Sequence, residues 1–84
     1  MDPLDGNAIA GPLMEYFGQE MTVAVGTCGH CGTRSQIAEL RVYMKAPGSV
    51  VRCWHCGNVV IVLFPARPAV QVNLTAFRLS EPPA

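Results

Sequence analysis

The sequence predicts a small, β-rich α+β domain in which one N-terminal helix precedes an antiparallel sheet of about four to five strands. Three observations lead to this prediction. Apolar residues recur at helical spacing within residues 4–18, the apolar period changes to two from Met21 onward, and all four cysteines stand in two copies of one short motif. A single domain of 84 residues buries only about 60% of its unfolded surface, so an extra source of stability is expected.

The N-terminal segment, residues 4–18, is expected to be helical. Its apolar residues share one face at helical spacing: Ile9, Leu13, Tyr16 and Phe17. Asp5 or Asn7 can cap the helix, and Gly18 ends it. Pro12 removes one backbone donor, so the segment is either a kinked helix or a turn at residues 6–10 followed by a helix from Pro12 to Phe17. We expect Tyr16 and Phe17 to anchor the core.

Residues 21–79 are expected to form the β body. Met21–Gly26 reads as a short strand that enters the first cysteine motif, and Ile37–Lys45 alternates between apolar and polar residues like a half-buried strand. A turn over residues 46–49 then returns the chain through residues 50–53 into the second motif. The pattern therefore predicts a hairpin between the two cysteine pairs.

The C-terminal part of the body is predicted to hold two more strands. Val59–Phe64 is an unbroken apolar run rich in β-branched residues, which is typical of a central strand covered on both faces, here with the N-terminal helix on one of them. Val70, Val72 and Leu74 then alternate with polar residues, as expected for a half-exposed last strand. Residues 80–84 are expected to be a flexible tail.

The cysteine motifs are Cys28-Gly29-His30-Cys31-Gly32 and Cys53-Trp54-His55-Cys56-Gly57, with 21 residues between the pairs. Each motif can form a tight turn that directs two thiolates at one ion, because the glycine tolerates a positive φ. The separation is close to the gap of about 15–20 residues that is typical of four-cysteine zinc sites. We therefore expect one structural Zn²⁺ per chain, which can supply on the order of 10 kcal/mol of stability.

With these motifs, residues 21–65 resemble the zinc-ribbon group, in which two Cys-x-x-Cys-Gly knuckles at the tips of antiparallel hairpins hold one metal ion. The opening Leu4-Asp5-Gly6-Asn7-Ala8-Ile9-Ala10-Gly11, followed by a Cys-x-x-Cys pair, is also similar to the start of a small uncharacterised family of bacterial proteins. That second resemblance covers most of the chain. It implies a stand-alone cytosolic protein with no established activity, and it supplies no catalytic residues.

Four thiolates around one ion leave no coordination position for a further ligand or for a catalytic water. His30 and His55 are not expected to ligate, since four sulfurs already complete a tetrahedral shell. A closed shell has no open position for an activated water, so we expect no enzymatic activity. Two such loops also resemble rubredoxin, an iron electron carrier, although the Trp54-His55 pair departs from its proline-containing second loop. A thiol-redox role is a third alternative.

Charge and composition point to a binding partner. Residues 1–20 carry four acidic and no basic residues, whereas residues 21–80 carry six basic residues against Glu39 alone. Only 14% of residues are charged, below the average of about 25%, and 50% are hydrophobic. We expect a protein partner or a homo-oligomer, with nucleic acid as the alternative. The candidate binding residues are Arg41, Tyr43, Lys45, Arg52 and Trp54.

The sequence also predicts where the protein resides. The N-terminus is acidic and has no apolar core typical of a signal peptide. The longest apolar run, Val59–Phe64, is six residues, far below the roughly 20 that span a bilayer, so no membrane association is expected. We therefore expect a cytoplasmic protein, and in that reducing compartment paired cysteines bind metal more often than they form disulfides.

Overall fold

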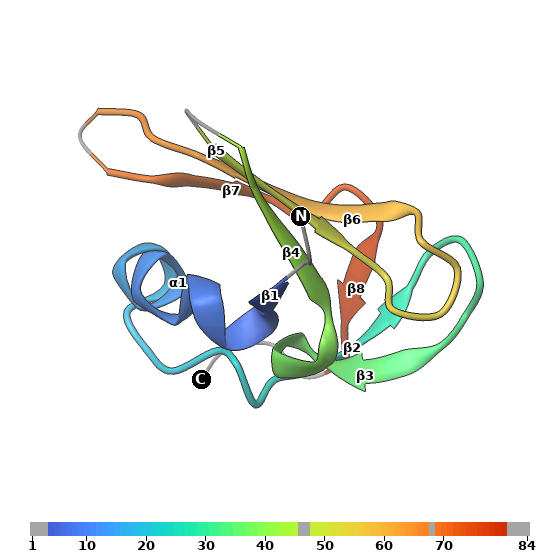
Figure 1. Ribbon diagram of the computed structural model, residues 1–84. Coiled ribbons are helices and arrows are strands. Elements are labelled where there is room, and N and C mark those ends of the chain that lie inside the picture. The colour runs from blue at the N-terminus through green and yellow to red at the C-terminus, as the bar shows by residue number, and fades with distance from the viewer. Residues whose placement is uncertain (1–3, 46–47, 68, 81–84) are drawn as a thin grey trace.

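Two antiparallel sheets and one helix build the fold (Figure 1). The computed structural model describes residues 4–45, 48–67 and 69–80. Along the chain its elements are β1 (Leu4–Asp5), the 3₁₀ helix η1 (Gly6–Ile9), α1 (Ala10–Phe17), β2 (Val25–Cys28), β3 (Arg34–Gln36), the 3₁₀ helix η2 (Ile37–Glu39), β4 (Arg41–Lys45), β5 (Gly48–Arg52), β6 (Val59–Phe64), β7 (Gln71–Asn73) and β8 (Phe77–Leu79). The larger sheet has the order β1-β4-β5-β6-β7 and the smaller one β3-β2-β8. The predicted β-rich α+β class is confirmed.

The N-terminal segment starts with a short strand and continues as two helical pieces. Asp5 Oδ1 accepts a hydrogen bond of 3.0 Å from the Asn7 backbone N–H and so caps η1. Because α1 begins at Ala10, Pro12 lies in its first turn, where a helix needs no backbone donor from that residue. Gly18 ends α1 with a φ of +76° and donates its N–H to Met14 O at 2.8 Å. The structure therefore agrees with the second predicted alternative, a turn followed by a helix, although α1 begins two residues before Pro12.

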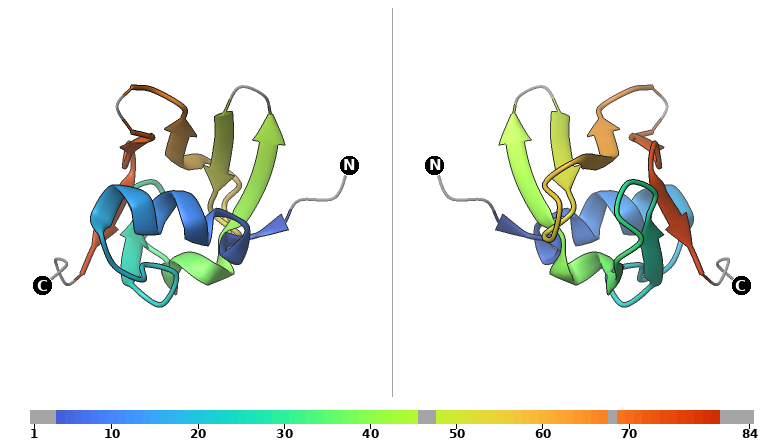
Figure 2. Two further views of the ribbon diagram at one scale, coloured as in Figure 1. Left: turned by 90° about the vertical axis from the view of Figure 1, so that its left-hand side faces the viewer. Right: turned by 90° about the vertical axis from the view of Figure 1, so that its right-hand side faces the viewer.

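Helix α1 lies against one face of the larger sheet (Figures 1 and 2). Ile9 and Leu13 are fully buried beneath that sheet, and Phe17 packs at the edge of the core. The prediction that Tyr16 anchors the core is wrong, because its side chain is 43% exposed. An eight-residue helix buries only a narrow stripe, and the Tyr16 ring instead meets the edge of Phe17, with ring centroids 4.9 Å apart.

The predicted hairpin between the cysteine motifs is formed by β4 and β5, in a register that pairs Arg41 with Arg52 and Lys45 with Gly48. Residues 46–47 of the predicted turn lie outside the described part. Two predicted strand starts are wrong. Strand β2 begins at Val25 rather than Met21, and Ile37–Glu39 forms η2 because Glu39 Oε1 accepts the Gln36 N–H at 2.7 Å and closes a helical turn.

Strand β6 is the predicted central strand, and it pairs with β5 on one side and β7 on the other. Val60 and Ile61 are both fully buried although neighbouring side chains point to opposite faces, so both faces of β6 are covered there. Strand β7 is half-exposed as predicted, but it is not the last strand. Strand β8 follows and pairs with β2 in the smaller sheet. Most of the predicted tail, residues 81–84, lies outside the described part.

One hydrophobic core joins the two sheets. Its members are Ile9, Leu13, Met21, Cys28, Ile37, Leu40, Val42, Val51, Cys53, Val60, Ile61, Leu63 and Phe77. Two cysteines, one from each motif, thus belong to the core itself. Within the described residues, no helix is long and apolar enough to cross a membrane.

Gly6 provides a test of how the N-terminal segment packs. A Cβ atom at Gly6 would overlap the backbone carbonyl of Ile37 in η2, whereas one at Gly11 would meet nothing within 4 Å. Gly6→Ala is therefore expected to lower the free energy of unfolding by about 2–3 kcal/mol. Gly11→Ala is the matched control and should melt close to the wild-type temperature. Thermal melting followed by circular dichroism measures both, and equal melting temperatures would contradict the packing of η1 against η2.

Candidate metal centre

Each cysteine motif forms the loop at one end of an antiparallel strand pair. The first motif connects β2 and β3 in the smaller sheet, and the second connects β5 and β6 in the larger sheet. Figure 1 shows the two loops side by side at the same end of the molecule. The site is therefore shared between the two sheets.

The two loops have nearly the same backbone geometry. Gly32 donates its N–H to Cys28 O at 2.9 Å, and Gly57 donates to Cys53 O at 3.0 Å, with a φ of +79° at both glycines. This left-handed conformation favours glycine, as the motif predicts. The backbone N–H two residues after the first cysteine points at its sulfur in both loops, with N···S distances of 3.4 and 3.3 Å. Such N–H groups stabilise a thiolate.

The four sulfur atoms gather at one point. The Sγ atoms of Cys28, Cys31, Cys53 and Cys56 all lie within 4.8 Å of one another. Two pairs that link the loops, Cys28 with Cys56 and Cys31 with Cys53, have Sγ···Sγ distances of 3.7 Å. A tetrahedral ion with metal–sulfur bonds of about 2.3 Å needs an edge of about 3.8 Å, whereas a disulfide needs about 2.05 Å. The group fits a four-thiolate metal shell, and all four cysteines are free.

The shell has an inner and an outer side. Cys28 and Cys53 are buried, with 2% and 1% exposure, while Cys31 and Cys56 are exposed. Burial raises the pKa of the Cys53 thiol to about 11. Hydrogen bonds from the Thr33 hydroxyl and backbone lower the pKa of Cys31 to about 5, and the backbone and side-chain amides of Asn58 lower the pKa of Cys56. The outer sulfurs ionise readily, whereas the inner Cys53 needs a cation to favour its thiolate.

Thr33 and Asn58 are functional residues that the sequence analysis missed. Thr33 Oγ1 lies 3.2 Å from Cys31 Sγ, and Asn58 Nδ2 lies 3.4 Å from Cys56 Sγ. Both residues stand two positions after the second cysteine of their motif, and both carry a side-chain donor. Extending the comparison of the two motifs by one residue would have found them.

The histidines of the motifs do not belong to the sulfur group. His30 and His55 are exposed, and neither is among the described residues whose ligand atoms gather at the site. The His55 ring meets the Trp54 ring edge-on, with centroids 5.6 Å apart, and a hydrogen bond from the His55 side chain also contributes to the lowered pKa of Cys31. Four sulfurs thus form the candidate ligand set.

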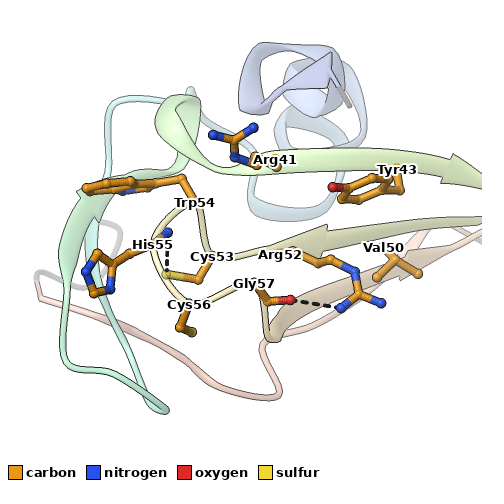
Figure 3. Close-up of a pocket in the computed structure, with 9 residues that line it drawn as sticks. All are labelled: Arg41, Tyr43, Val50, Arg52, Cys53, Trp54, His55, Cys56 and Gly57. Carbon is orange, nitrogen blue, oxygen red and sulfur yellow. Dashed lines mark hydrogen bonds between the residues drawn. The ribbon is translucent and has the colours of Figure 1, made fainter. Parts of the chain in front are cut away.

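Four of the five predicted binding residues surround one hollow of about 640 Å³ beside the second loop (Figure 3). Arg41 and Tyr43 reach it from β4, Arg52 from β5 and Trp54 from the loop. Arg52 Nη1 donates to Gly57 O at 2.8 Å, and its Cζ lies 5.8 Å from the centre of the Tyr43 ring. The fifth predicted residue, Lys45, ends β4, and its side chain lies outside the described part.

The inner and outer cysteines should differ in chemical reactivity. In the metal-loaded protein, limiting iodoacetamide is expected to modify Cys31 and Cys56 before Cys28 and Cys53, because only the outer sulfurs are reached by solvent. Peptide mass spectrometry after digestion measures the order. Protein unfolded in guanidinium with a chelator is the control, in which the four rates should converge. Equal rates in the folded protein would contradict the two-sided shell.

Comparison with known proteins adds a family assignment. No curated protein and no solved structure matches the chain. One family, described as a family of unknown function (DUF6510), matches residues 1–83 and so covers nearly the whole sequence. This agrees with the small uncharacterised family that the opening residues resemble. The chain, a β-rich domain with a four-cysteine group that could hold a metal ion, belongs to the DUF6510 family.

Proposed function

We propose that the protein is a small cytoplasmic binding module that holds one structural zinc ion through Cys28, Cys31, Cys53 and Cys56 and acts through contacts with other proteins. The observation that carries the structural role is that the sulfur group is continuous with the hydrophobic core, since Cys28 and Cys53 are core members. An ion there links the two loops, and with them the two sheets. Zinc is favoured over iron because zinc is the usual ion of structural four-cysteine sites.

A catalytic role is not part of the proposal. Catalytic zinc keeps three protein ligands and an open position for water, whereas four thiolates fill a tetrahedral shell. The compact S···S distances support the filled shell. When bound, the ion supplies stability, while the protein groups around it supply thiolate stabilisation through backbone and side-chain donors.

Exposed apolar side chains support the protein-contact role. Among the described residues, seven large apolar side chains have exposed fractions above 40%: Leu4, Met14, Tyr16, Val23, Met44, Trp54 and Phe64. Three of them, Leu4, Met44 and Phe64, belong to strands of the larger sheet, and two belong to α1. Together with the low proportion of charged residues, they favour a surface that is covered by another protein in use.

Metal analysis tests the zinc proposal first. Untagged protein purified without added metal is expected to contain about one zinc per chain and to show no visible absorption. Plasma mass spectrometry and an absorption spectrum of the same sample measure this. His30→Ala is the matched control and should keep its zinc, since the imidazole is outside the sulfur group. One iron per chain with visible charge-transfer bands would instead make the protein a rubredoxin-like electron carrier.

The structural role predicts loss of the fold when a ligand is removed. Cys28→Ser or chelation is expected to abolish cooperative thermal unfolding, because on the order of 10 kcal/mol of binding free energy is lost from a domain of small total stability. Circular dichroism and melting curves measure the loss. A Cys28→Ser variant with native dichroism and an unchanged melting temperature after chelation would refute a structural ion.

The protein-contact role predicts partners that do not depend on nucleic acid. A tagged chain expressed in its own cells should copurify with defined proteins, or with untagged copies of itself, after nuclease treatment. His30→Ala, which lies outside the hollow beside the second loop, should keep these partners, whereas Cys28→Ser, which loses a metal ligand and with it the fold, should lose them. Complexes that vanish on nuclease treatment alone would favour the nucleic-acid alternative.

A further inference from the structure

We propose that the hollow beside the second cysteine loop binds a short acidic segment of a protein partner, with carboxylates at Arg41 and Arg52 and an apolar or aromatic side chain against Trp54. This inference rests on the proposed function and adds the chemistry of the partner. The hollow lies on one face of the β4–β5 hairpin and ends at the loop that follows Arg52 (Figure 3). The fold therefore presents the site on two paired strands anchored by the sulfur group.

The charge of the hollow fits a carboxylate ligand. Arg41 and Arg52 are direct partners across the β4–β5 ladder, so their side chains leave the same face of the sheet. No Asp or Glu is among the described residues that line the hollow. Cys53 and Cys56 line its loop end, so the proposed carboxylates lie at the strand end, beside the two arginines. Asp5 is the direct partner of Arg41 across the β1–β4 ladder, on the side away from β5, and its Oδ1 accepts the Asn7 N–H. Two like charges on adjacent strands are unfavourable unless an anion joins them.

Arg52, one of the two arginines of the hollow, is held in place before a ligand arrives. Arg52 is fixed from two sides, by its hydrogen bond to Gly57 O and by the Tyr43 ring. A guanidinium has five N–H donors, so this bond leaves others for a carboxylate. Trp54 is 42% exposed beside the two arginines and offers an apolar face. Preorganised charged and aromatic groups of this kind reduce the entropy lost on binding.

A peptide fits this surface better than a nucleic acid does. Nucleic-acid affinity comes from many phosphate contacts, and the hollow presents two arginines in a chain of zero net charge. The four acidic residues among positions 1–20 would repel a long polyanion. A volume of about 640 Å³ accommodates a few side chains, and two carboxylates suffice to engage two guanidinium groups.

A peptide selection tests the proposal without knowledge of the partner. Random twelve-residue peptides displayed on phage are selected on the immobilised, zinc-loaded protein. We expect enrichment of sequences with at least two Asp or Glu residues near an aromatic or large apolar residue. The best peptide is then synthesised together with a version in which Gln and Asn replace its acids. The second peptide should bind at least about tenfold more weakly, as expected when hydrogen bonds to charged groups are lost.

Trp54 is the only tryptophan of the chain, so tryptophan fluorescence reports on ligand binding in the hollow. Titration of the acidic peptide is expected to shift its emission and to saturate. Arg41→Gln and Arg52→Gln should each raise Kd about tenfold, while Arg67→Gln, an exposed arginine that does not line the hollow, should leave Kd unchanged. Zinc content and dichroism of each variant show that the fold is retained. Arg41→Gln gives the clearer result, because Arg52→Gln also removes a hydrogen bond to Gly57 O in the second cysteine loop.

The outcomes separate this inference from the proposed function. Enriched peptides without acids, or equal effects of Arg67→Gln and Arg52→Gln, would overturn the acidic ligand and leave the protein-contact role intact. A ten-residue oligothymidine that binds, shifts Trp54 emission and displaces every selected peptide would overturn both. A selection without any enriched sequence would also overturn the inference.

Discussion

The fold depends on the convergence of two loops, from two different sheets, on a single point defined by four sulfur atoms. The smaller sheet contains three strands of three or four residues each, which is too little to be stable alone. Strand β8 attaches it to the end of the chain, and the first cysteine loop attaches it to the β5–β6 loop. An ion bound by all four sulfurs would join these separate associations into one closed structure.

The four-cysteine site and the hydrophobic core share residues, because Cys28 and Cys53 belong to both. Cys28 faces Phe77 across the β2–β8 pair, and a side chain at Gly26 would overlap the same Phe77 ring. The inner sulfurs are thus packed by the residues that hold the sheets together. The outer sulfurs instead have hydrogen-bonding side chains beside them, Thr33 at Cys31 and Asn58 at Cys56. One face of the shell contributes to packing and the other adjusts the charge of the thiolates.

Local signals in the sequence predicted the parts of the structure that local chemistry determines. The repeated motif predicted both loop turns, Gly18 predicted the end of α1, and the apolar run predicted the central strand β6. The predictions failed where contacts with residues elsewhere in the chain determine the secondary structure. Ile37–Glu39 fits either a strand or a helical turn, and the choice depends on the Glu39 cap. Strand β8 is three residues long and is defined by partners about 50 positions away in β2.

The two-sided exposure of the shell has a kinetic consequence. Because Cys31 and Cys56 face solvent while Cys28 and Cys53 are buried, an incoming thiol or chelator can displace the outer ligands one at a time. The ion can then leave towards solvent without prior opening of the packed interior. The lifetime of an ion bound there would be set by ligand exchange at the surface and not by the rate of global unfolding. A protein built in this way can be thermodynamically dependent on its metal and still equilibrate quickly with the metal supply around it.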